Sequence, residues 1–136
     1  MKIASNIAGA LLGLVFVAVS SMVLFKFGPN PPPPPEGTPP AHFMAAFVPT
    51  GYLTFVKVFE LLGGLLVAIP RTRNLGLLVL GPIIINILAF HMFVTGGAGL
   101  FEPMIIGIVA LALFLLWVER KAFVGLVVRP MGKPQP

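Results

Sequence analysis

Cysteine is missing from the 136-residue sequence. Without thiols, the chain by itself can form no disulfide, no thiol relay and no iron–sulfur cluster. The absence also excludes membrane enzymes that exchange electrons between a cysteine pair and a quinone, because these enzymes need two thiols.

Charged residues are scarce as well. They make up 10% of the chain, whereas hydrophobic residues make up 57%. About a quarter of the residues in a soluble domain are charged, so this composition predicts an integral membrane protein. The formal net charge is +5. The basic residues fall at the ends of apolar runs, where they orient a protein in a bilayer, so no nucleic-acid partner is expected.

Four apolar runs are present, each close to the ~20 residues that a helix needs to cross the hydrocarbon. They are continuously apolar and do not alternate, which favours helices over barrel strands. Short second and third loops make consecutive helices antiparallel neighbours. The sequence therefore predicts one all-α domain, an integral membrane four-helix bundle with up-down-up-down order. The predicted helices cover residues 3–25, 52–69, 75–94 and 104–118.

The first run has two interpretations. It has features of a cleaved signal peptide, because Lys2 precedes it and residues 18–20 are small. We favour an uncleaved helix, because the apolar run is longer than the roughly 7 to 15 residues of a signal h-region. Gly9 and Gly13 then lie on one helix face, where another helix can come close, although glycine is also common in membrane helices that lack such a contact.

Residues 28–40 include five consecutive prolines. Such a run is extended, and we expect an external connector here; a ligand for a proline-binding groove is the alternative. The apolar residues 41–48, which precede Pro49, predict a short helix at the membrane surface. The tail, residues 124–136, is predicted to be loose.

The basic residues divide unequally between the two sides of the predicted bundle. If all four helices cross, Lys2, the second-loop residues Arg71 and Arg73, and the basic residues of the tail share one side. The other side keeps only Lys26. Because positive residues are retained in the cytoplasm, we expect a multi-pass protein of the cell membrane with both termini cytoplasmic.

The second run carries two charged residues, Lys57 and Glu60. A charge inside a membrane span is costly, so such residues are kept for a site or for a structural pair. Three residues apart, they share a helix face and can form an ion pair. Gly63 and Gly64 follow one turn later, where another helix can approach. Whether the pair is structural or functional stays open at this point.

The third run contains Asn86 and His91. Asn86 is either a structural contact between helices or a ligand contact, and His91 is either an interfacial histidine or a proton-handling group. At ~1.5 Å per residue, Glu60 and Asn86 both lie ~13 Å below the outer surface, with Lys57 at ~9 Å and His91 at ~6 Å.

The similar depths predict one ligand-binding polar pocket that opens outward. Its candidate residues are Lys57, Glu60, Asn86 and His91. Asn86 and His91 are separated by ~140° on a helix, so both cannot point into a narrow pocket, and Asn86 is expected to be the inner member.

Other polar residues have simpler explanations. His42 has no His, Cys or carboxylate partner at metal-binding spacing nearby, so no metal site is expected. Glu102 and Pro103 suit the first turn of the fourth helix. Trp117 is expected to anchor the end of that helix at the membrane surface.

The strings KVFELLGG on the second helix and GPIIINILAFH on the third resemble the DoxX-like family of small four-helix membrane proteins, and nearly the whole chain is similar. The likeness lies in a glutamate followed by paired glycines and an asparagine ahead of a histidine. Named members of that family are linked, as small membrane subunits, to quinone-dependent oxidation of sulfur compounds. The resemblance implies quinone as the cofactor, which would rest here on Lys57, Glu60, Asn86 and His91.

This resemblance suggests a small subunit or accessory component of a quinone-linked membrane redox system. The alternative is a non-enzymatic assembly or interaction factor that docks partner helices on its glycine faces. A small oligomeric pore or carrier ranks lower, because four helices rarely enclose a pathway and the sequence has no internal repeat. The expected partners are the lipid bilayer, other membrane subunits or further copies of the chain.

Overall fold

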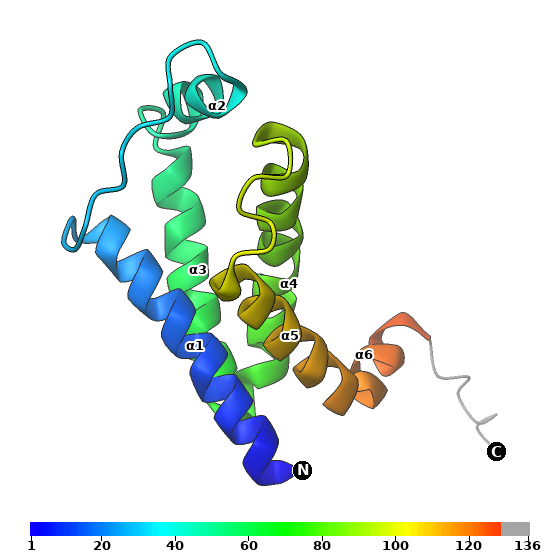
Figure 1. Ribbon diagram of the computed structural model, residues 1–136. Helices are drawn as coiled ribbons and strands as arrows, with labels where there is room; N and C mark the ends of the chain where they lie inside the picture. Colours follow the sequence, from blue (N-terminus) through cyan, green and yellow to red (C-terminus); the bar gives the residue numbers. More distant parts are fainter. Residues whose placement is uncertain (129–136) are drawn as a thin grey trace, which may run out of the picture.

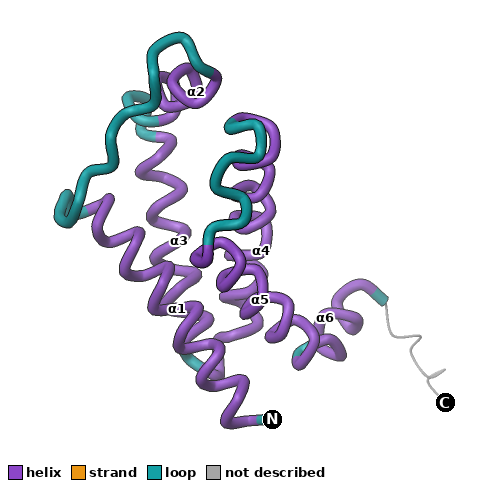
Figure 2. The backbone as a smooth tube through the Cα atoms, in the orientation of Figure 1, coloured by secondary structure: helices purple, strands orange, loops and turns teal. Residues whose placement is uncertain are grey.

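The computed structural model describes residues 1–128, and this part of the chain consists of helices and loops without β-strands (Figures 1 and 2). The predicted all-α fold class is confirmed. A 3-10 turn, Pro70–Thr72, precedes the fourth α-helix, and a π-helical segment, Phe90–Val94, follows it. The described α-helices are α1 (Lys2–Leu24), α2 (Pro39–Phe47), α3 (Tyr52–Ala68), α4 (Arg73–Ala89), α5 (Pro103–Val118) and α6 (Arg120–Val127).

Two helical stretches are long and apolar enough to cross a membrane: Lys2–Leu24 and Pro70–Val94. Helices α3 and α5 contain 17 and 16 residues, fewer than the ~20 that a span needs. Each is continued by a bent neighbour, α2 at 82° to α3 and α6 at 73° to α5. The described chain therefore has two candidate spans, or up to four if each bent pair counts as one.

The predicted loose tail, residues 124–136, begins inside the short helix α6, whose residues 124–127 are helical but exposed. Phe123, within this helix, packs against the hydrophobic core, which gives the segment a tertiary contact that the sequence pattern did not reveal. The tail from residue 129 onward lies outside the described residues.

Helix α3 packs along α1 on one side and along α4 on the other, and α5 packs on α1 and at fewer points on α4. The short helix α2 lies over the end at which α3 begins (Figure 1). The core between the helices is made of aliphatic side chains and one phenylalanine. Its fully buried members include Leu12, Val67, Leu80 and Leu115.

Glycines permit the close packing of α3 on both of its neighbours. A Cβ built on Gly13 of α1 would lie 2.5 Å from the carbonyl oxygen of Gly64 and 2.7 Å from the Cβ of Ala68. A Cβ built on Gly63 would lie 2.7 Å from a methyl carbon of Leu80 on α4. The prediction that Gly13 and the paired glycines let neighbouring helices come close is confirmed.

Candidate functional site

Lys57 and Glu60 form the ion pair that their spacing predicts. The Nζ atom of Lys57 lies 2.9 Å from Oε2 of Glu60, and the two side chains are 15% and 5% exposed. One turn further along α3, Gly64 packs against α1, where a Cβ would lie 3.1 Å from the Cβ of Phe16. The pair therefore occupies the part of α3 that leads into the tight contact with α1, and the charge of each member is neutralised by the other.

Asn86 lies on the exposed side of α4. Its Nδ2 atom donates a hydrogen bond of 2.9 Å to the carbonyl oxygen of Pro82, one turn earlier in the same helix. Ile84, two residues away, is buried, and two residues correspond to a rotation of ~200° about the helix axis. The prediction that Asn86 is the inner member of a pocket is therefore wrong, because packing of the Ile84 side of α4 turns Asn86 outward.

His91 lies in the π-helical segment and is half-buried. Its Nδ1 atom is 2.8 Å from the carbonyl oxygen of Ile87. A carbonyl oxygen only accepts, so Nδ1 carries a hydrogen, and in the uncharged form of the ring Nε2 is then an acceptor. This Nε2 faces the following loop, where a Cβ built on Gly99 would lie 3.5 Å from it.

The four predicted pocket residues do not form one hydrogen-bonded cluster. Within residues 1–128, Lys57 and Glu60 bond to each other, while Asn86 and His91 each bond to a carbonyl of their own helix. Residues at similar depths form one pocket only if their side chains also face one another. The rotation of α4 turns Asn86 away from Glu60, so this second condition is not met.

A row of aromatic rings connects α3, α2 and the π-helical segment. Neighbouring ring centroids are between 4.9 and 6.3 Å apart, which is the usual range for interacting aromatic pairs. The spacing of Tyr52, Phe55 and Phe59 along one face of α3 is visible in the sequence, whereas the contact of Phe43 with Phe90 across elements is not. The row consists of Phe59, Phe55, Tyr52, Phe47, Phe43, Phe90 and His91.

An open pocket is lined by other residues of α2 and of the π-helical segment, the two elements that hold Phe43 and Phe90. It has a volume of about 460 Å³ and lies between the start of α2 and the end of the π-helical segment. Such a volume falls within the range of roughly 300–1,000 Å³ that small-molecule sites occupy. The pocket is lined by Pro35, Thr38, Pro39, Pro40, Phe93, Val94, Thr95 and Gly96.

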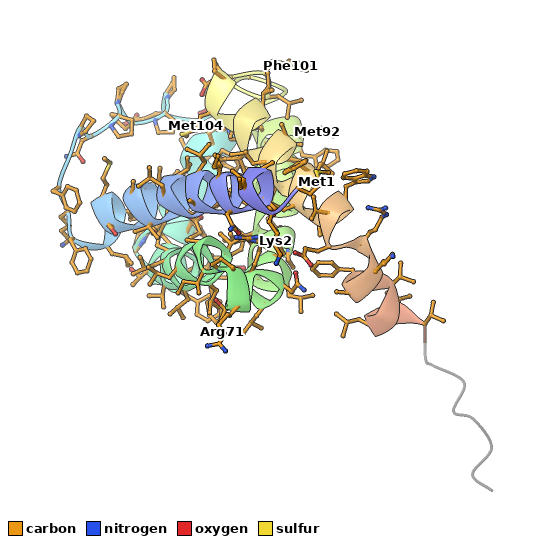
Figure 3. The ribbon with its side chains drawn as sticks, turned by 90° about the horizontal axis from the view of Figure 1, so that it is seen from below. Met1, Lys2, Arg71, Met92, Phe101 and Met104 are labelled. Carbon is orange, nitrogen blue, oxygen red and sulfur yellow. The ribbon has the colours of Figure 1, made fainter. Side chains whose placement is uncertain are left out.

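Arg73 corrects a further prediction, because it is not a solvated loop residue. It is the first residue of α4 and is only 4% exposed. Its Nε atom donates to the carbonyl oxygen of Val67 at 3.3 Å, and its Nη2 atom donates to Oδ1 of Asn6 at 3.0 Å. Figure 3 shows Arg71, in contrast, extending away from the helices. Arg73 thus joins α1, the end of α3 and the start of α4.

Gly9 leaves the space that the buried guanidinium occupies. A Cβ built on Gly9 would lie 2.7 Å from Nε of Arg73 and 2.9 Å from the carbonyl oxygen of Val67. A cation at the last carbonyls of a helix is favoured by the helix dipole. Arg73 is therefore explained as a structural contact.

Replacing Arg73 with lysine is expected to lower the free energy of unfolding by ~1.5–3 kcal/mol. The single nitrogen of an ammonium group cannot reproduce the two hydrogen bonds that Nε and Nη2 of the guanidinium donate to Val67 and Asn6. The melting temperature of the full chain in detergent measures this effect. The same change at the exposed Arg71 is the matched control and is expected to leave the melting temperature unchanged. Equal melting temperatures for all three proteins would contradict the assignment.

No group of three or more His, Cys, Asp or Glu side chains within the described part of the chain is arranged to hold a metal ion. His42 is exposed on α2.

The chain is similar to the uncharacterized protein YwoB of Bacillus subtilis (strain 168), with 32% identity over 75 residues. The aligned stretch covers 55% of this chain and 47% of YwoB, so the chain spans about half the length of this relative. No protein-family model and no solved structure matches the chain. These comparisons assign neither a family nor an activity to the chain.

Proposed function

We propose that the protein is a DoxX-like integral membrane protein that serves as a small subunit or accessory component of a quinone-linked redox system. In this proposal α1, α3, α4 and α5 cross the cell membrane as an antiparallel four-helix bundle, and both termini are cytoplasmic. The packing of α3 between α1 and α4, with α5 next to α1 and α4, supports this arrangement.

The observation that carries the quinone-linked role is the aromatic row that ends at His91. The centroid of Phe90 lies 5.0 Å from that of Phe43 and 5.4 Å from that of His91. Flat apolar rings beside a single oriented polar group are the usual lining of a small-molecule site. The location of His91 in a π-helical segment adds support, because such segments occur frequently at functional sites.

The residues at this end of the row fit the chemistry of a quinone. Its head group is a flat ring that stacks on aromatic side chains, and its oxygens need hydrogen-bond partners. Phe43 and Phe90 are the flat apolar rings next to His91. The acceptor Nε2 of His91, on the side of the following loop, matches the O–H group of the reduced form. A bound quinone would supply reversible two-electron chemistry, while these residues would bind and orient its ring. Lys57 and Glu60 bond to each other, and the proposed contact with the quinone head group does not include them.

Replacing His91 with phenylalanine is expected to weaken quinol binding about tenfold, because the ring stack on Phe90 is kept while one hydrogen bond is lost. Equilibrium dialysis of the purified full chain against a short-chain quinol measures the affinity. His42→Phe on α2 is the matched control and is expected to bind like the unmodified protein. The proposal fails if the unmodified chain binds no quinol, or if both variants bind it equally well.

An assembly or interaction factor is the second candidate, and an open apolar groove favours it. The groove has a volume of about 340 Å³ and lies between the end of α4 and α5, where these helices touch at few points. A partner helix could pack there on exposed apolar side chains. Purification from native membranes separates the candidates: a co-purified oxidoreductase subunit supports the first, and an unrelated membrane protein supports the second. The groove is lined by Leu88, Leu100, Phe101, Ile105, Ile106, Val109, Ala110 and Leu113.

A further inference from the structure

Helix α6 turns away from α5 by 73° and lies beside the bundle (Figure 1). Its residues divide between two sides. Lys121, Ala122 and Gly125 share one side at helical spacing, while the larger apolar residues share the other side, together with Arg120 in the first turn. Phe123 packs on the core, but Leu126 and Val127 are 67% and 85% exposed.

The junction between α5 and α6 holds an aromatic and cationic contact. The guanidinium carbon of Arg120 lies 4.7 Å from the ring centroid of Trp117. Nη1 of Arg120 also donates a hydrogen bond of 2.6 Å to the backbone carbonyl oxygen of Trp117. Lys121 is exposed next to it. Glu119, which is half-buried, is the acidic residue of this junction. With Arg120 and Lys121 as the two cations, the junction has a net charge of +1.

These features match a helix that lies in the plane of a membrane surface. If α5 crosses the bilayer, a helix at 73° to it runs close to that plane. Exposed Leu126 and Val127 then reach the acyl boundary, and Trp117 lies at the level of the headgroups. Arg120 and Lys121 are placed where anionic headgroups lie, and anionic headgroups attract lysine and arginine at this level.

We propose that α6 and Trp117 form a binding surface for anionic phospholipid, with Arg120 and Lys121 as the headgroup contacts. This proposal rests on the membrane insertion of α5 in the proposed function but not on quinone binding. The partner is identified by charge complementarity: the exposed groups at the junction are cations, and the exposed apolar residues beside them need a hydrocarbon environment.

Trp117 is the only tryptophan in the chain, so its fluorescence reports this junction directly. The full-length protein is reconstituted in vesicles of an equal mixture of phosphatidylcholine and phosphatidylglycerol, with bromine on the acyl chains of one lipid or of the other. We expect brominated phosphatidylglycerol to quench Trp117 roughly twofold more than brominated phosphatidylcholine, because the cations enrich anionic lipid around them.

Lys121→Gln is expected to lower this ratio while leaving the Arg120–Trp117 contact intact, and the double variant Arg120→Gln/Lys121→Gln is expected to bring the ratio to one. Arg71→Gln, which removes an exposed cation outside α6, is the matched control and is expected to keep the full ratio.

Equal quenching by the two lipids in the unmodified protein would overturn the proposal, because Trp117 would then contact lipid without any preference for the anionic headgroup. A ratio that falls equally in Arg71→Gln would also overturn it, because general surface charge would then explain the enrichment. Quenching by neither lipid would overturn the insertion of α5 together with the proposal. Each of these outcomes is distinct from a failure of quinol binding.

Discussion

Replacing Gly13 with leucine is expected to lower the free energy of unfolding by ~3 kcal/mol or more, because α1 can no longer pack on α3. Even the first carbon of the new side chain would lie 2.5 Å from the carbonyl oxygen of Gly64. That atom belongs to the backbone of α3, so no rotamer change relieves the overlap. Leucine is a better helix former than glycine and is more apolar, so helix propensity and membrane insertion do not explain a loss.

The matched control is Gly107→Leu in α5. Apart from the adjacent residues and the backbone of its own helix, no atom lies within 4 Å of a Cβ built on Gly107. The same change is therefore expected to be neutral or to stabilise by up to ~1 kcal/mol through helix propensity. The melting temperatures of the two variants in detergent provide the comparison. If the Gly13 and Gly107 variants melt at the same temperature, the close contact between α1 and α3 is not present in the folded protein.

The sequence predicted features that depend on one helix alone. The apolar composition indicated helices, and the spacing of Lys57 and Glu60 indicated an ion pair, because residues three apart lie on one helix face. Gly13 and Gly64 indicated close contacts, because only small residues let helix backbones approach. In each case local geometry sufficed.

Features that depend on the rotation of one helix against another were not predictable in the same way. Asn86 faces outward because packing favours the side of α4 that carries Ile84, and no local signal distinguishes a polar residue that bonds to its own helix from one that faces a neighbour. The contact between Phe43 and Phe90 depends on the bend between α2 and α3, which is 82°.

The burial of Arg73 also could not be predicted from the sequence. Its position after Pro70 indicated a loop residue, because arginine at a helix end is usually solvated. The structure buries it because Gly9 on α1, far away in sequence, leaves room for the guanidinium beside the end of α3. The spacing between Gly9 and Gly13 is visible in the sequence, but the residue that fills the space beside Gly9 is not.

Replacing Lys57 with methionine is expected to lower the free energy of unfolding by ~3–5 kcal/mol, because it leaves the carboxylate of Glu60 in a 5% exposed position without its cation. Glu60→Gln is expected to be milder. It keeps the shape of the side chain, and the ammonium group of Lys57, whose side chain is 15% exposed, can extend along its four-carbon stem toward water.

The double variant Lys57→Met/Glu60→Gln completes a double-mutant cycle with the two single variants. It distinguishes a structural ion pair from a functional one. A buried ion pair that is replaced by neutral groups of similar shape can be neutral for stability, so the double variant is expected to melt close to the unmodified protein and above Lys57→Met alone. Because His91 and the aromatic row are unchanged, it is also expected to bind quinol normally. A double variant that is stable but has lost quinol binding would show that the pair belongs to the binding site, and the head group would then have to lie between α3 and α1.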